Sequence, residues 1–292
     1  MATLNQQIAN IFETSTSVSD ITRSLRTLGI AQREIDNLFF QHGIQRRNSI
    51  NDITFGVEIE CYNVVREEIA QRLREAGIAC YVEGYNHTDH TDHFKVVTDA
   101  SLCGNDTAEV VSPILKGQAG MQTLEKVCKV LNEINAKVNK SCGLHVHFGL
   151  NNVDFKTYRN IFINYAKCEN VIDSFMPQSR RNNTYCQSFR AHGNIYELLM
   201  GACSREDIAD IFSRDRYYKV NPVAYRRHNT IEFRQHSGTV DFAKISNWIE
   251  FLKGLISYSR TSRVECARSI DDIPFINAER KAYYNMRKAA LA

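Results

Sequence analysis

The stretch from Ile53 to Tyr62 constrains the fold more than any other, because polar and apolar side chains alternate along it. Its odd positions hold the apolar residues Phe55, Val57, Ile59 and Cys61. Successive side chains of a β-strand point to opposite faces, so a strand here places Glu58 and Glu60 together on the other face, roughly 7 Å apart. Glutamate is a poor strand former and like charges repel, so the pair does not serve stability. A hard cation such as Mg²⁺ or Mn²⁺ would relieve the repulsion; an acidic face that meets water is the alternative.

Composition narrows the class of protein. The 292 residues carry 36 basic and 33 acidic side chains, and this net charge of +3 indicates neither nucleic-acid nor membrane binding. The nine cysteines include no Cys-x-x-Cys pair, which favours reduced thiols in a cytosol. Residues 1–12 lack the basic and apolar regions of a signal peptide, and no apolar run is long enough to span a bilayer. We therefore expect a soluble, cytoplasmic protein with no membrane partner.

Residues 1–50 are predicted to form a helical appendage, separate from a larger domain over residues 51–292. Helical patterns cover Leu4–Phe12, a second segment from Ser19 and Asp20 to Leu28, and Ala31–Phe40, before a polar linker. Residues 1–47 contain five arginines, four acids and no lysine, a weak footprint for nucleic acid. We expect this appendage to mediate oligomerisation or to dock a protein partner.

The larger domain mixes strands and helices without a regular alternation. Beyond the first strand, strands are predicted at residues 79–83, 94–98, 107–111, 141–149, 220–225 and 230–236. Helices are predicted at residues 64–76, 121–138, 155–175, 191–200, 206–212 and 242–259. This pattern predicts an α+β fold with a mainly antiparallel sheet.

Three later strands repeat the two-faced pattern of the first. Glu109 lies within an apolar strand, and His145 and His147 share one face of another. The third would carry Thr230, Glu232, Arg234 and His236 on a single face. Together these strands predict one sheet that lines a charged funnel, with enough carboxylates and imidazoles for two metal ions beside an arginine. Such a site suits phosphoryl transfer, and no glycine-rich phosphate loop is present to hold ATP by its backbone.

Six motifs in this order resemble the amidoligase family, the carboxylate-amine ligases related to glutamine synthetase and glutamate-cysteine ligase. They are Phe55–Glu60, Val97–Leu102, Glu109–Pro113, Cys142–His147, Met176–Arg181 and Thr230–Thr239. The resemblance covers about residues 53–255 and leaves residues 1–50 outside it. It implies a glutamine-synthetase-like curved sheet forming a funnel, with helices packed outside, over a catalytic domain at residues 51–292.

The resemblance also implies roles for individual residues. Glu58, His145 and Glu232 would hold the metal that bridges the phosphates of ATP, and Glu60 and Glu109 would hold a second Mg²⁺ or Mn²⁺. Glutamine synthetase brings three acids to its second metal, whereas the motifs identify two here. His147 would contact the phosphates, and Arg234 would act with Glu232 and Glu60 in catalysis. The weaker phosphate or carboxylate clamps would be Arg180, Arg181, Arg226 and Arg227.

Three functions follow from these patterns. The first is an ATP-dependent ligase that joins a small-molecule or peptide carboxylate to an amine through an acyl phosphate. The second is a phosphotransferase like the guanidino kinases, and the third is a non-catalytic binding or structural protein with the same fold.

The segment His87–His93 fits no standard zinc pattern and is interpreted as a solvated loop, with a lid over the funnel as the alternative.

Overall fold

The computed structural model describes residues 3–15, 18–31, 34–35, 38, 53–84, 92–151 and 153–291. Two compact units, Met1–Ser49 and Ile50–Ala292, make up the chain. The proposed linker and most of the predicted loop His87–His93 lie outside the described residues.

The first unit contains α1 (Leu4–Thr14) and α2 (Val18–Thr27), as predicted to within two residues at each end. Thr3 and Gln6 form a reciprocal capping box at the start of α1, which satisfies backbone N–H groups there. Ile21, Leu25 and Ile35 form a small core of their own. Of the third predicted helix, Ala31–Phe40, Glu34, Ile35 and Leu38 are helical and Ala31 is not, whereas its other residues lie outside the described residues.

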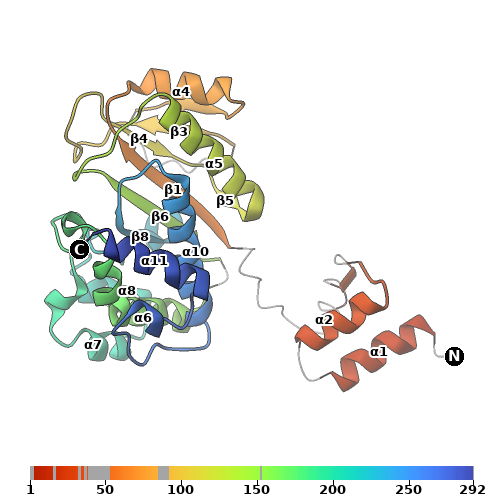
Figure 1. Cartoon of the computed structure of the whole chain (residues 1–292). Coiled ribbons are helices and arrows are strands. Elements are labelled where there is room, and N and C mark those ends of the chain that lie inside the picture. Colours follow the sequence, from red (N-terminus) through yellow and green to blue (C-terminus); the bar gives the residue numbers. More distant parts are fainter. Residues whose placement is uncertain are drawn as a thin grey trace. The chain divides into compact units, whose positions relative to one another are not determined.

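The second unit is built on one mixed sheet in the order β2-β3-β4-β1-β6-β8-β7, with β5 also paired to β1 (Figure 1). The strands are β1 (Thr54–Cys61), β2 (Cys80–Val82), β3 (Phe94–Val97), β4 (Ala108–Val111), β5 (Leu115–Lys116), β6 (Gly143–Gly149), β7 (Val220–Asn221) and β8 (Thr230–Ser237). Every pairing between these strands is antiparallel except that of β2 with β3. The predicted α+β class with a mainly antiparallel sheet is therefore confirmed.

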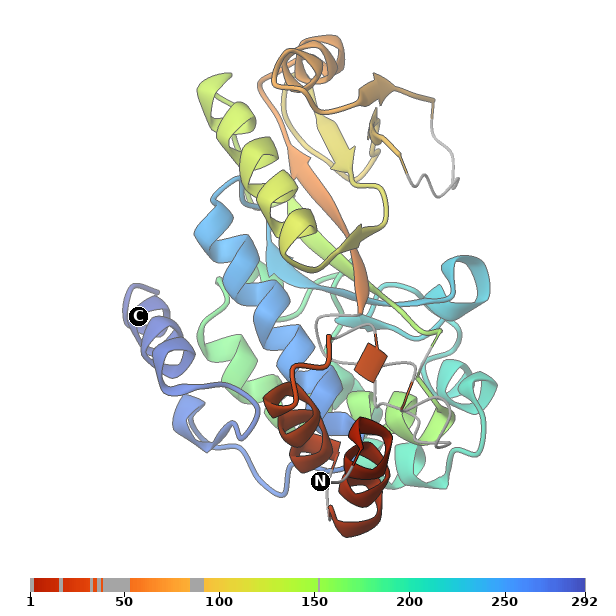
Figure 2. The same cartoon turned by 90° about the vertical axis from the view of Figure 1, so that its right-hand side faces the viewer.

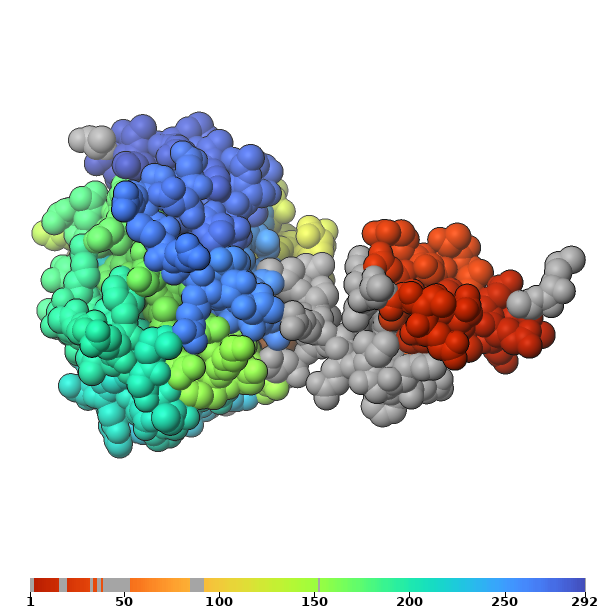
Figure 3. Space-filling model, turned by 90° about the horizontal axis from the view of Figure 1, so that it is seen from below, coloured from red at the N-terminus to blue at the C-terminus, as the bar shows by residue number. Residues whose placement is uncertain are grey.

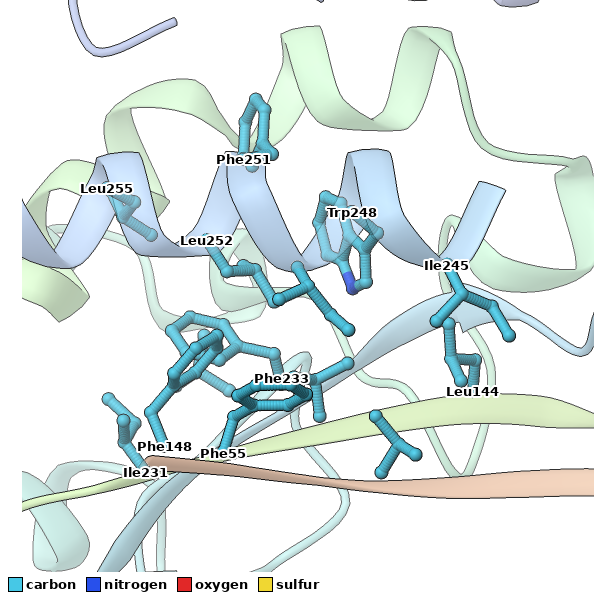
Figure 4. Packing of buried hydrophobic residues seen from close by; sticks show 14 of the residues in the cluster. Phe55, Leu144, Phe148, Ile231, Phe233, Ile245, Trp248, Phe251, Leu252 and Leu255 are labelled. Atoms are coloured by element: carbon cyan, nitrogen blue, oxygen red, sulfur yellow. The ribbon is translucent and has the colours of Figure 1, made fainter. Parts of the chain in front are cut away.

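Helices cover the apolar face of this sheet. The helices of the second unit are α4 (Arg66–Glu75), α5 (Gly117–Glu133), α6 (Phe155–Ser174), α7 (Ile195–Gly201), α8 (Arg205–Ile211), α9 (Ala224–His228), α10 (Phe242–Ser259) and α11 (Ala278–Ala289). Figure 2 shows α5 and α10 running along the same side of the strands. Phe55, Phe148 and Phe233 point from three strands toward Trp248 and Leu252 of α10 (Figure 4). Burial of these large apolar groups fixes which way each strand faces.

Two of the predicted elements have bounds that are wrong for local reasons. The helix predicted at residues 121–138 begins at Gly117 and ends at Glu133, where Asn135 adopts a left-handed backbone with φ 60°. The strand predicted at residues 220–225 stops at Asn221, since Pro222 has no N–H to donate to a neighbouring strand. The chain turns instead into the short helix α9.

The C-terminal helix α11 carries a further part of the core that the sequence pattern did not predict. The Tyr284 ring lies 4.3 Å from the Phe175 ring, and Arg287 Nε donates a 2.9 Å hydrogen bond to the Phe175 carbonyl. In Figure 3 the blue C-terminal segment lies against the green surface of the same unit. Among the described helices, none has the length and apolar character needed to cross a bilayer.

Candidate active site

β1 lies at the centre of a polar cluster, because its pairing with β4 and β6 places polar residues of the three strands opposite one another. Glu58 is directly opposite His145 of β6, and Glu60 is directly opposite Glu109 of β4. Directly opposed residues share a face of the sheet, and the intervening Val57 and Ile59 point into the core. The pleat therefore gathers acidic and imidazole side chains from three strands on the face away from α10.

His145 is the hub of this cluster. Its Nδ1 lies 2.8 Å from Glu58 Oε2 and 3.8 Å from Glu232 Oε1. Its Nε2 lies 3.5 Å from Glu60 Oε1. Glu60 also accepts a hydrogen bond from the Gly143 backbone N–H, at the start of the same strand β6. One imidazole thus contacts carboxylates from both β1 and β8.

A bulge in β8 separates Arg234 from the residues that follow it. Val146 pairs with Phe233 but Leu144 pairs with His236, so Arg234 and Gln235 together oppose the single residue His145. The predicted common face for Glu232, Arg234 and His236 is therefore wrong at its last member. The His236 ring lies 5.6 Å from the Trp248 ring of α10, on the core side of the sheet. Glu232 and Arg234 remain in contact, because Arg234 Nη1 donates to Glu232 Oε1.

Gln235, the second bulge residue, is held by a buried network. Its side chain accepts a hydrogen bond from Tyr165 Oη and donates to Asp173 Oδ1. Lys219 donates 2.6 Å to the same carboxylate oxygen of Asp173, and its carbonyl accepts from the Arg234 N–H at 2.8 Å. Sequence reasoning missed this network, since it joins α6, Lys219 just before β7, and β8 across about 70 residues of chain.

The carboxylates of the cluster differ in their electrostatics. Burial raises the pKa of Glu109 well above its usual range, and the nearby charges of Glu58, Glu60 and Asp99 raise it further. Burial would also raise the pKa of Glu58, but the imidazoles of His145 and His147 outweigh it and hold that pKa well below its usual range. In the metal-free cluster, burial and the neighbouring carboxylates therefore disfavour the charged form of Glu109.

Three groups of side chains in the cluster could hold a metal ion. Within each group the candidate ligand atoms lie within 4.8 Å of one another. The groups are Glu58, His147 and Glu232; Glu58, Glu109 and His145; and Glu60, Asp99 and Glu109.

Asp99 is the acid that the motif analysis missed as a ligand. It follows β3 by two residues in a turn, where no strand periodicity marks it, although it lies inside the motif Val97–Leu102. Its Oδ1 accepts a 2.6 Å hydrogen bond from the Ser101 N–H, which orients the side chain. Asp99 completes a set of three acids with Glu60 and Glu109.

His147 offers an observation that fits a bound cation. Its Nδ1 lies 3.0 Å from Thr230 Oγ1, whereas its buried Nε2 makes no hydrogen bond to any of the described residues. That Nε2 lies 3.2 Å from Glu58 Oε1 and 4.0 Å from Glu232 Oε1. An orphaned imidazole nitrogen between two carboxylates has the donor set of a divalent metal centre.

The five arginines singled out by the motifs occupy different surroundings. Arg234 is buried beside Glu232, with its guanidinium 5.7 Å from the Tyr217 ring. Arg180 is buried next to His145 and Gly143, and it donates to the carbonyls of Arg234 and Gln235.

The other three arginines are not brought into the cluster by any contact of the described residues. Arg181 Nε donates to the Met176 carbonyl at 3.0 Å. Arg226 and Arg227 are exposed on α9, and Arg226 Nε lies 3.8 Å from Glu206 of α8.

Comparison with known proteins supplies the family. Among solved structures, the chain is similar to a bifunctional glutathione synthetase from Pasteurella multocida, at 12% identity and a TM-score of 0.37, over 83% of this chain and 42% of that one. The chain thus spans less than half the length of that protein. No curated protein matches this chain. The family described as "putative amidoligase enzyme" matches residues 51–256. Because this match covers more than half of the chain, the protein belongs to that amidoligase family, as its motifs predict.

Proposed function

We propose that the second unit is an ATP- and Mg²⁺-dependent carboxylate-amine ligase that forms an amide bond through an acyl phosphate. The observation that carries this proposal is the convergence of carboxylate and imidazole ligands from β1, β4, β6 and β8, next to a buried arginine. Membership of the amidoligase family supports the same class of reaction.

In this proposal Glu58, Glu232 and the His147 Nε2 atom hold one ion. His145, which is grouped with Glu58 and Glu109, is a further candidate ligand next to Glu58. Glu60, Asp99 and Glu109 hold the second. When bound, such ions would neutralise the negative charge on the phosphate and acyl oxygens. The like charges that raise the pKa of Glu109 are the ones that a cation would relieve.

The proposed reaction has two steps. A carboxylate oxygen of the acyl substrate attacks the γ-phosphorus of ATP, the bond to ADP breaks, and an acyl phosphate forms. The amine nitrogen then attacks the acyl carbon, inorganic phosphate leaves, and the nitrogen loses a proton. Arg234 would neutralise charge on the acyl or phosphoryl oxygens during transfer, because its planar guanidinium can donate two parallel hydrogen bonds to one group.

Incubation with ATP, Mg²⁺ and a panel of amino acids and short peptides, followed by mass spectrometry, tests the proposal. We expect a condensed product whose mass is that of the two substrates less one water, with equal amounts of ADP and phosphate. A stable phosphorylated substrate without condensation would instead identify a phosphotransferase.

Glu232→Gln is the matched variant for this assay. It keeps the size of a buried side chain but removes a ligand charge, so product and ADP should both disappear. Glu133→Gln on the exposed end of α5 should behave as wild type. Failure of the wild type to consume ATP with any member of a broad panel would count against the proposed chemistry.

A further inference from the structure

A buried polar side chain beside the cluster, that of Asn221, has no role in the motifs. Asn221 of β7 is 5% exposed and lies directly opposite Glu232 of β8. Directly opposed residues share a face of the sheet, so Asn221 points to the face that carries the carboxylates. Its Nδ2 donates a 2.5 Å hydrogen bond to Glu232 Oε2. A carboxylate has only acceptors, so the amide nitrogen, and not the amide oxygen, must face it.

The Asn221 amide is also held from its other end. Its Oδ1 accepts a 2.9 Å hydrogen bond from the Val223 backbone N–H, which closes a turn of the Asx type. Pro222 lies between the two residues, and its ring restricts the backbone of this turn. Because Val223 occupies the amide oxygen, Nδ2 is left to face Glu232. Two independent contacts thus give the side chain one orientation.

The two oxygens of the Glu232 carboxylate have different partners. Oε2 accepts from Asn221, whereas Oε1 accepts from Arg234 Nη1. Oε1 also lies 3.8 Å from His145 Nδ1 and 4.0 Å from His147 Nε2. The terminal torsion of a glutamate side chain is broad, so a carboxylate with few partners can turn. The hydrogen bond from Asn221 restricts that torsion and keeps Oε1 on the side of the imidazoles.

The strand that carries Asn221 is short but firmly anchored. β7 has two residues and lies at the edge of the sheet. Lys219, the residue before it, is fully buried, and its Nζ lies 2.7 Å from Glu169 Oε1 and 2.6 Å from Asp173 Oδ1, both on α6. The Lys219 carbonyl accepts from the Arg234 N–H at 2.8 Å. Asn221 therefore belongs to backbone that is tied to α6 as well as to β8.

We propose that Asn221 is a positioning residue that holds Glu232 in the orientation needed to bind a divalent ion. The ion is the one assigned above to Glu58, His147 and Glu232, so the inference rests on the proposed function. Hydrogen-bond partners of ligating side chains orient them, and their loss typically weakens metal binding by about 10–100-fold. Since Val223 occupies the Asn221 oxygen, the amide acts through Glu232 and is not itself a ligand.

Titration of the full chain with Mn²⁺, without nucleotide or substrate, tests this inference. Electron paramagnetic resonance measures the free ion, and the wild type should bind two ions. Asn221→Leu keeps the approximate size of the side chain but removes the donor, so the affinity for one ion should fall about tenfold or more. The affinity for the other ion, assigned to Glu60, Asp99 and Glu109, should not change.

Asn221→Ser is a second variant, chosen to preserve the turn. Its hydroxyl can still accept the Val223 N–H, but its shorter side chain brings no donor to Glu232. It should weaken the same ion to a similar extent. Circular dichroism and thermal melting establish that each variant is folded.

A double-mutant cycle tests whether Asn221 acts through Glu232. In the Glu232→Gln background the charged ligand is already lost, so Asn221→Leu should cause no further loss of Mn²⁺ affinity. An equal loss in both backgrounds would mean that Asn221 supports the fold in general, and it would overturn the inference.

Asn160→Leu is the matched control. Asn160 is 2% exposed and, like Asn221, uses both ends of its amide: it donates to the Ser259 carbonyl and accepts from Arg263 Nε. Neither partner belongs to the cluster. This variant should therefore lower the melting temperature and leave the binding of both ions unchanged.

The outcomes separate this inference from the proposed function. Wild-type affinity for both ions in folded Asn221→Leu and Asn221→Ser would overturn the inference and leave the proposed metal centre and ligase intact. A wild type that binds no Mn²⁺ would contradict both the inference and the proposed centre. A wild type that binds two ions but forms no amide would count against the ligase alone, and the titrations would still decide the role of Asn221.

Discussion

At the scale of single residues, the surroundings in the cluster stabilise the charged form of some carboxylates and destabilise that of others. The pKa of Glu232 is lowered, since Arg234 and His147 together outweigh the effect of its burial. The pKa of Glu60 is raised, chiefly by burial, although His145 and the Gly143 N–H act against the rise. Glu109 is the extreme case, with a pKa far above its usual range because burial and three carboxylates act together.

Glu109→Gln should stabilise the metal-free protein above pH 7, by about 1–2 kcal/mol if one like-charge contact is removed. A carboxyl with a raised pKa contributes stability at pH values below its ordinary pKa near 4.5, and that contribution is lost as pH rises through the folded-state value. The melting temperature of the variant should therefore exceed that of wild type at pH 8 and approach it near pH 5.

Glu133→Gln serves as the control for this series, because Glu133 is half-exposed and pairs with Lys129 at 3.9 Å. It should leave the pH dependence of melting unchanged. A metal-free Glu109→Gln protein that melts lower than wild type at pH 8 would contradict this account. It would show that Glu109 stabilises the fold through hydrogen bonds and that its charge is not repelled by the neighbouring carboxylates.

Arg234→Lys should lower turnover far more than it weakens ATP binding. Lysine keeps the charge but cannot reproduce the planar fork of donors, so the barrier should rise by roughly 2–4 kcal/mol. Steady-state amide formation and nucleotide affinity are measured side by side, with the exposed Arg226→Lys as control. Near-normal turnover would make Arg234 a structural partner of Glu232 and pass the role to Arg180, the other buried arginine beside the cluster.

At the scale of elements, the alternation of polar and apolar residues predicts β1, β6 and most of β8 because one face of each is buried against α10. What the alternation cannot predict is a change of register. The bulge at Arg234 and Gln235 turns His236 into the core. Its hydrogen-bond partners lie in α6 and at Lys219, just before β7, so the local pattern does not predict it. Asp99 escaped identification for a related reason, since a turn has no periodicity.

Gln235→Leu should both destabilise the protein and reduce turnover. It removes the partner of Tyr165 and Asp173 in a fully buried network, which should cost about 1–3 kcal/mol of unfolding free energy. Because Gln235 shares the bulge with Arg234, turnover measured well below the melting temperature should fall as well. Gln71→Leu, on the exposed face of α4, is the control. Unchanged melting and turnover would mean that the bulge does not depend on this network.

At the scale of the whole molecule, every residue assigned to the cluster belongs to the second compact unit. The first unit has its own small core around Ile21, Leu25 and Ile35. Removal of residues 1–49 should therefore leave the melting temperature and the affinity for Mg²⁺ and ATP close to those of the full chain. Titration calorimetry and thermal melting check this, and a folded truncated protein that no longer binds ATP would place part of the site in the first unit.

The proposed metal centre is tested most directly by anomalous X-ray scattering from crystals grown with Mn²⁺ and a non-hydrolysable ATP analogue. We predict two manganese peaks, one bounded by Glu58, His147 and Glu232 and the other by Glu60, Asp99 and Glu109, with ligand distances of about 2.0–2.2 Å. Crystals of Glu232→Gln should lose the first peak. Manganese found only outside this cluster, or none at all beside the bound analogue, would contradict the proposed centre.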